Sequence, residues 1–234
     1  MKASMKAAFA ALMFLTAPVM AHAAVPIIDW DPAYVWQVGA TPTNMPLGGE
    51  MKVVGTVSMF GPPLQDLNAG DPTTEFTFYI HGLTSLGTTS VGPPATTFYT
   101  TNYAGGQIEL YFDTSPDASF APNPPNAAVP STFTDGTVLL TGVFTRMVVY
   151  TNNFTAFKTG NMEGDITWTG GTLFNRFSPG GQPCPGLFIG GITWSTAPGI
   201  GIPGYLFRND GKIDMQCATP SRTDTWGSIK RLYR

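Results

Sequence analysis

The chain has 234 residues, a formal net charge of −3 and a charged fraction of 12%, about half the share usual in globular domains. Such a length forms one good hydrophobic core, or at most two small ones. The acidic balance argues against nucleic-acid binding, because neutralising phosphates requires a surplus of Lys and Arg. Hydrophobic residues make up 43% of the chain, and 27 glycines and 21 prolines predict a folded, loop-rich domain.

The first 23 residues are predicted to be a secretory signal peptide. Two lysines precede an apolar run over residues 7–20, and Ala21-His22-Ala23 supplies the small residues that a signal peptidase recognises. The run is too short to span a membrane comfortably, so no transmembrane anchor is expected. We expect the mature protein, residues 24–234, to be secreted and to work outside the cytoplasm, either extracellularly or in the periplasm or at the outer cell surface. Loss of the two lysines leaves it with a net charge of −5.

Apolar and polar residues alternate with a period of two through most of the mature chain, which predicts half-buried antiparallel strands. In chain order, the predicted inward-facing residues are Met51, Val53, Val57 and Met59; Phe76, Phe78 and Ile80; Ile108, Leu110 and Phe112; Ile166 and Trp168; and Ile213, Met215 and Cys217. Residues 138–150 carry apolar side chains on both faces. They predict a long central strand that is covered on both sides and bent at Gly142.

Turn signals separate these strands. Asp135-Gly136 and Asn209-Asp210-Gly211 predict tight turns, because Asn, Asp and Gly adopt the backbone conformations that turns need. The glycine pairs at 105–106 and 190–191 predict further tight turns or bulges.

Two long segments are rich in proline and glycine. Residues 116–130 are predicted to form an extended surface loop, and residues 178–204 short strands joined by irregular turns. Many short strands at this spacing predict an all-β fold. We expect an antiparallel β-sandwich over residues 24–224, of which a jelly roll is one form.

A short amphipathic helix is predicted in the C-terminal tail, residues 225–234. Trp226, Ile229 and Tyr233 are spaced three and four residues apart, as on one face of a helix. A helix this short is not stable alone, so we expect the tail to pack on its own domain, on a partner or on an export machine.

Cys184 and Cys217 are the two cysteines of the chain. In an oxidising compartment such a pair is expected to form a disulfide. Since Cys217 shares a strand face with Ile213 and Met215, the bridge should point into the core. It closes a loop of about 34 residues, for which chain entropy gives roughly 3–4 kcal/mol. The alternative is two buried free thiols.

No catalytic motif stands out. Glu109 and Glu163 lie on the polar faces of predicted strands and could form the carboxylate pair of a glycoside hydrolase, as could Glu109 with Asp165. Solvent-facing strands ordinarily carry such residues, however, so an enzyme is not the favoured interpretation. His81, the one histidine of the mature chain, is expected to be an ordinary exposed or hydrogen-bonded strand residue.

Two binding sites are considered. Asp113 and Asp117 lie in a short acidic loop of the kind that holds calcium, the one cofactor that the sequence suggests. Trp30, Tyr34 and Trp36 lie near the mature N-terminus, where exposed rings could stack on the apolar faces of sugars.

Three stretches between Thr74 and Thr172 are FTFYIHGLT (76–84), TDGTVLLTG (134–142) and WTGGT (168–172). In these stretches the chain resembles exported bacterial β-sandwich proteins of unknown function. Some proteins of that kind end in a Pro-Glu-Pro sorting tail (PEP-CTERM), which is not found here. The resemblance implies a role at the cell surface or in the matrix.

The sequence thus predicts a secreted, non-enzymatic binding or structural protein of the cell surface or extracellular matrix. Its partner would be a cell-surface protein or a polysaccharide. The alternative is a carbohydrate-binding module or a glycoside hydrolase. A third possibility, an outer-membrane barrel, ranks last because it usually ends in an aromatic residue, whereas this chain ends in Arg234.

Overall fold

The computed structural model describes residues 26–121, 124, 130–154, 158–178, 182–194 and 202–216. The strands are β1 (Pro26–Gln37), β2 (Glu50–Phe60), β3 (Glu75–Val91), β4 (Phe98–Ala104), β5 (Gln107–Asp113), β6 (Thr137–Asn152), β7 (Thr159–Gly170), β8 (Gly186–Thr193) and β9 (Phe207–Met215). Three short 3-10 helices, η1 (Pro94–Thr96), η2 (Ser131–Phe133) and η3 (Phe174–Phe177), lie between them. The predicted all-β antiparallel class is confirmed.

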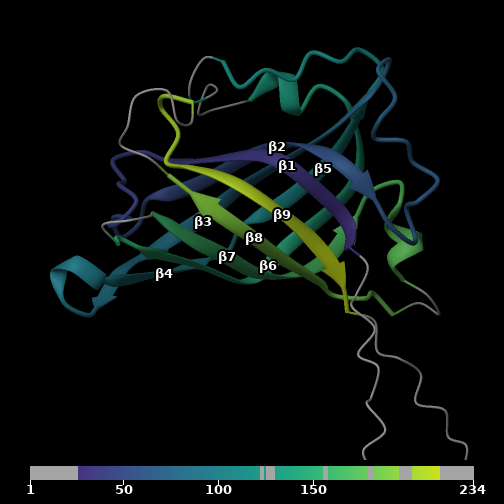
Figure 1. Ribbon diagram of the computed structural model, residues 1–234. Helices are drawn as coiled ribbons and strands as arrows, with labels where there is room; N and C mark the ends of the chain where they lie inside the picture. The colour runs from purple at the N-terminus through teal and green to yellow at the C-terminus, as the bar shows by residue number, and fades with distance from the viewer. Residues whose placement is uncertain are drawn as a thin grey trace, which may run out of the picture.

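All strands belong to one antiparallel sheet that closes on itself (Figure 1). β1 pairs with β2 on one side and with β9 on the other. β4 and β5 both lie between β3 and β6 and act as a single strand, interrupted at Gly105-Gly106. Each strand therefore pairs with its neighbours in sequence, and the sheet forms an eight-stranded up-and-down barrel.

The closed barrel corrects the predicted sandwich. Inward and outward residues alternate along every strand in both architectures, so the period of two does not distinguish them. The difference arises at β1. Trp30 lies opposite Val57 of β2 and also opposite Gly211 of β9, so the N-terminal strand joins the two ends of the sheet.

Apolar side chains fill the barrel. The largest fully buried ones include Trp30, Phe188, Phe207 and Ile80, and the predicted core residue Trp168 is 3% exposed. One remaining internal cavity is about 10 Å³, with an entirely apolar lining of Ile28, Trp30, Phe78, Ile108, Leu110, Trp168 and Ile213. A void of this size is at the lower limit for a single water. This cavity therefore has no room for an organic ligand.

A second apolar cluster lies on the outside of the barrel, over β1, β2, β3 and β5. Its buried members are Trp36, Val54, Tyr79, Tyr111 and Phe133. The segment after β5 covers it: the Phe120 ring lies 4.7 Å from that of Tyr34, and the Tyr205 hydroxyl donates to the Phe120 carbonyl. The described part of the predicted loop 116–130 thus lies on the surface, with Ala118 and Phe120 partly buried against this cluster.

The predicted faces of the strands are largely confirmed. Phe78, Ile108 and Ile166 point inward and are buried, whereas Met59 is 48% exposed. Residues 137–152 form the predicted long strand, and the β6–β7 register shifts at Gly142. The strand is not covered on both sides as predicted, because Arg146 and Tyr150 are exposed on its outer face.

One predicted turn is wrong and a second is confirmed. Asp135-Gly136 forms the bend before β6, as expected. Asn209-Asp210-Gly211, however, lies inside β9, where β1 and β8 pair with it on both sides. The pair Gly190-Gly191 likewise lies inside β8.

Packing explains why these residues belong to strands. Asn209 is fully buried, and its side-chain oxygen accepts a 2.7 Å hydrogen bond from the Trp30 indole. A Cβ on Gly211 would lie 2.8 Å from the Trp30 ring, and one on Gly190 would overlap Asn209. The glycines therefore make room for a buried polar pair.

The predicted signal peptide, residues 1–23, and the predicted tail helix, residues 225–234, lie outside the described residues. Within the described ranges, no helix has the length and apolar character needed to cross a membrane.

Candidate functional site

The predicted aromatic platform does not exist at the surface. Trp30 is 0% exposed, Tyr34 8% and Trp36 3%. Trp30 fills the barrel interior, and Tyr34 and Trp36 pack against Tyr205 on the outside. The prediction was wrong because β1, although close to the predicted N-terminus of the mature chain, pairs on both edges.

The two carboxylates proposed for a hydrolase lie far apart. Glu109 is opposite Thr141 on β6, whereas Glu163 is opposite Val148 on the same strand. Seven positions along a strand amount to about 23 Å. Glycosidase carboxylates are separated by about 5–9.5 Å, so this pair has the wrong spacing. Asp165, the other candidate partner, forms an ion pair with Arg146.

His81 belongs to a small group of polar and aromatic side chains on the outer face of β3 and β5. Its ring stacks on Tyr79, with 4.8 Å between ring centroids, and its Nε2 lies 3.6 Å from Glu109 Oε2. The Tyr111 hydroxyl donates a 2.6 Å hydrogen bond to the same carboxylate oxygen. Burial, together with the nearby Glu50 and Glu109 carboxylates, raises the pKa of Tyr79 to about 12. These contacts fit the expected strand histidine.

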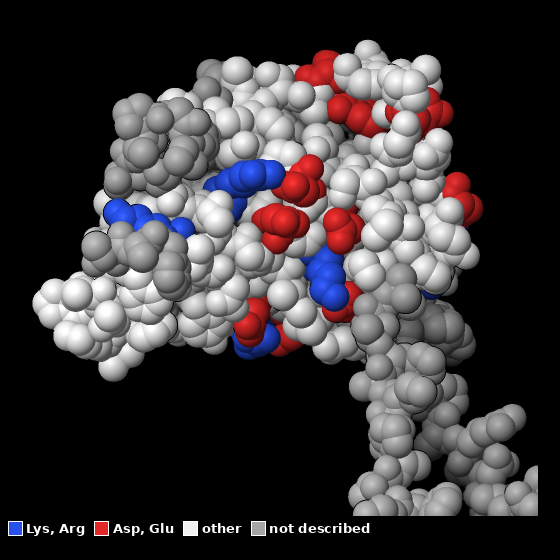
Figure 2. Space-filling view, in the orientation of Figure 1, with Lys and Arg blue, Asp and Glu red and all other residues white. Residues whose placement is uncertain are grey.

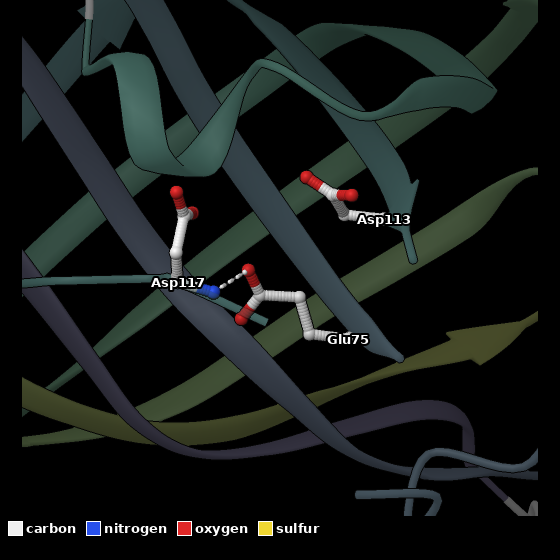
Figure 3. A group of neighbouring side chains, drawn as sticks. All are labelled: Glu75, Asp113 and Asp117. Atoms are coloured by element: carbon white, nitrogen blue, oxygen red, sulfur yellow. Dashed lines mark hydrogen bonds between the residues drawn. The ribbon is translucent and has the colours of Figure 1, made fainter. Parts of the chain in front are cut away.

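The two residues predicted to bind calcium do lie together, and a third carboxylate joins them. Asp113 ends β5, Asp117 follows in the next loop, and Glu75 begins β3 directly opposite Asp113 (Figure 3). One oxygen from each of the three lies within 4.8 Å of the others. Sequence analysis missed Glu75, because its nearness to Asp113 depends on the pairing of β3 with β5.

Backbone donors hold this acidic group in place. Glu75 Oε1 accepts hydrogen bonds from the backbone N–H groups of Asp117 (2.8 Å) and Ala118 (3.0 Å), and Asp113 accepts one from Ser115. Partial burial raises the pKa of Glu75; the bonds from Asp117 and Ala118 oppose this shift, and the charges of Asp117 and Asp113 add to it. The group therefore concentrates negative charge that a cation would relieve.

A groove of about 450 Å³ runs over the outside of β7, β8 and β9 and reaches the irregular part of β1. It was not predicted. Its lining residues are Asp31, Thr159, Gly160, Gly191, Ile192, Thr193, Arg208 and Asp210. Acidic and basic side chains lie next to one another across the face that carries β1 and β9 (Figure 2).

The register positions the charged residues of the groove. The β1 ladder shifts between Trp30 and Ala33, and at this irregularity Asp31 Oδ1 lies 2.5 Å from Arg208 Nη2. The hydrogen bond that the Arg208 guanidinium donates to the Asp31 carboxylate raises the pKa of Arg208 above its ordinary value. Both side chains stay about half exposed, so their other polar atoms are open to a ligand.

A correct prediction of β9 would have revealed part of this groove. Along a strand, residues 208, 210 and 212 share one face. Since Asn209 points inward, Arg208 and Asp210 must point outward. Because a turn was predicted at Asn209-Asp210-Gly211, the alternation of inward and outward residues along this strand was not recognised.

Cys184 is buried, with 5% of its surface exposed. The described part of the chain contains no free cysteine. Cys217 lies outside the described residues, so the pairing of the two stays a prediction.

Comparison of the chain with protein-family models, with curated proteins and with solved structures finds no match. The resemblance to exported bacterial β-proteins therefore stays a prediction.

Proposed function

We propose that this chain is a secreted, non-enzymatic binding protein of the cell surface or extracellular matrix, and that its ligand binds on the outside of the barrel. The supporting observation is the contrast between the inside and the outside. The described internal cavity is about 10 Å³, whereas the outer groove is about 450 Å³. The groove size falls within the range of small-molecule sites.

A polysaccharide suits the groove better than an apolar ligand. Asp31 and Asp210 offer carboxylate acceptors, Arg208 offers guanidinium donors, and Thr159 and Thr193 offer hydroxyl groups. Such groups form hydrogen bonds with the many hydroxyls of a sugar chain. This favours the carbohydrate-binding form of the alternative function, whereas the spacing of Glu109 and Glu163 speaks against its hydrolase form.

The test is a glycan array with polysaccharide pull-downs, using residues 24–234 with and without calcium. Arg208→Ala should weaken binding of the selected glycan about 10–100-fold, because hydrogen bonds to a charged group contribute roughly 1.5–3 kcal/mol. Gly191→Gln should weaken it as well. A Cβ there meets its nearest atom, the Asp210 carbonyl oxygen, at an ordinary 3.7 Å, so the long side chain fills the groove without a backbone clash.

Arg146→Ala is the matched control, because Arg146 forms a similarly exposed ion pair with Asp165 away from the groove. It should bind like the unmodified protein. If Arg208→Ala and Gly191→Gln bind the glycan as tightly as Arg146→Ala does, the binding site lies outside the groove. If the unmodified protein binds no glycan on the array and no polysaccharide in the pull-downs, the polysaccharide proposal is contradicted.

Calcium binding by Glu75, Asp113 and Asp117 is a separate proposal, supported by their clustered oxygens. Extracellular calcium sites have dissociation constants of about 0.1–1 mM. With calcium at about ten times the dissociation constant, linkage gives roughly 1.4 kcal/mol, or a rise in Tm of about 3–6 °C. Because its raised pKa lets Glu75 hold a proton at higher pH than usual, the effect should weaken as the solution becomes acidic.

Differential scanning calorimetry with calcium or with a chelator checks this expectation. Asp113→Asn should abolish the rise, and Asp135→Asn, which changes a carboxylate outside the group, should preserve it. A calcium response of the same size in Asp113→Asn would rule out this site.

A further inference from the structure

The barrel leaves one segment of β3 with an open edge. β2 pairs with β3 only as far as Thr84, and the backbone of Ser85 then bonds to Gly48 and Gly49. From Thr88 to Val91, β3 pairs with β4 on one side. On its other side the described residues form no backbone–backbone hydrogen bond with this segment; only the Thr88 side chain, at its start, bonds to the backbone of Met45. The β3–β4 hairpin projects beyond the barrel, at the lower left of Figure 1.

This edge lacks the usual protection. Exposed edge strands commonly carry charges or proline, which prevent another strand from pairing with them. Residues 82–108 contain no Asp, Glu, Lys or Arg, and the two prolines of the hairpin lie in its tip. The β3–β4 register shifts between Ser85 and Thr88, at the base of the hairpin, and the pairs from Thr88 to Val91 are regular.

Apolar surface accompanies the open backbone. Val91 is 71% exposed and its partner on β4, Phe98, is 52% exposed. Thr89 and Ser90 are also exposed. The lobe that the hairpin forms in Figure 2 carries neither basic nor acidic colour, in contrast to the mixed charges on the barrel wall. A partner strand would therefore meet hydrogen-bonding groups and apolar side chains without opposing charges.

We propose that this edge pairs with the same edge of a second copy of the chain, through an antiparallel β3–β3 contact about a two-fold axis. Side chains directly opposite one another in an antiparallel pair lie on the same face of the sheet. We place Ser90 at the two-fold axis. Thr89 then lies opposite Val91 of the second copy, so that the outer faces of the two hairpins form one continuous surface. A two-fold contact uses one self-complementary surface twice, which this uncharged strand provides.

Charge also explains why two copies would meet at this place and not elsewhere. Two mature chains repel each other, since each carries a net charge of −5. A contact at the tips of two projecting, uncharged hairpins keeps the charged barrel walls apart. The dimer should therefore strengthen as salt screens the remaining repulsion.

Sedimentation velocity of residues 24–234 over a concentration series tests the proposal. The unmodified protein should pass from monomer to dimer. Thr89→Lys places a charge on the open edge and should weaken the dimer at least tenfold. Thr167→Lys makes the same charge change at an exposed position on the barrel wall and should leave the dimer unchanged. Thermal melts of both variants confirm that they fold.

Crosslinking checks the register independently. Ser90→Cys should form an intermolecular disulfide on mild oxidation, because the two Ser90 positions face each other across the axis, whereas Thr167→Cys should not. A monomer at all concentrations, a dimer that Thr89→Lys leaves intact, or crosslinking by both cysteine variants alike would overturn the proposal. None of these outcomes depends on the groove or on glycan binding.

Discussion

Asn209→Leu is expected to lower the free energy of unfolding by about 2–4 kcal/mol, although the two side chains have similar size. Asn209 accepts the 2.7 Å hydrogen bond from the Trp30 indole, and both residues are fully buried. Leucine leaves the indole N–H without this acceptor, and a buried unsatisfied donor costs about 1–3 kcal/mol. The substitution also removes the hydrogen bond from the Asn209 amide to the Gly191 carbonyl.

A double-mutant cycle separates the hydrogen bond from packing. Trp30→Phe removes the donor and leaves a cavity, and adding Asn209→Leu to it should cost clearly less than Asn209→Leu alone. Urea unfolding followed by circular dichroism measures all four proteins. Asn161→Leu, which changes an asparagine on the outer face, is the control and should stay within about 0.5 kcal/mol. Strictly additive effects would show that the pair contributes no coupling.

The same pair shows how far the sequence predicts this fold. The inward faces of β3, β5 and β7 are predictable, since Phe78, Ile108 and Trp168 belong to simple alternating patterns. β9 breaks its pattern with a buried asparagine followed by Asp210 and Gly211, three residues that by composition resemble a turn. Only the position of Trp30 on β1, almost 180 residues earlier, gives Asn209 its partner. Closure of the barrel is hidden for the same reason, because it depends on contacts between the two ends of the chain.

The candidate sites follow a related rule. Asp113 and Asp117 are close in sequence, so their grouping was predictable, whereas Glu75 joins them only through strand pairing. The groove combines β1 with β7, β8 and β9, and only the alternation along β9, which places Arg208 and Asp210 on one face, could have indicated part of it. Conversely, Glu109 and Glu163 both lie on the polar faces of strands, but they are far apart in the barrel. Groups of residues that are close in sequence were thus predictable, whereas groups formed by different strands depend on how those strands pair.

Reduction of the protein is expected to lower its free energy of unfolding by roughly 3–4 kcal/mol, if Cys184 and Cys217 form the predicted bridge across about 34 residues. The described residues support this pairing. The Gln216 N–H donates a 2.8 Å hydrogen bond to the Pro185 carbonyl, and Gly186 lies opposite Met215. The chain just before position 217 therefore runs beside the chain that follows Cys184, close to the start of β1, where Pro26 pairs with Asp214.

Thiol labelling and unfolding together decide between the bridge and two buried free thiols. Unfolded, non-reduced protein should expose no reactive thiol, and two labelled cysteines would contradict the bridge. The variant with both Cys184→Ala and Cys217→Ala should be about as unstable as the reduced protein, and reducing agent should not change it further. A bridge acts mainly by restricting the unfolded chain, so the single variant Cys217→Ala should lose nearly the full amount. Two free thiols predict instead that reductant has no effect on any of these proteins, because packing alone would then hold the Cys184 loop against β9.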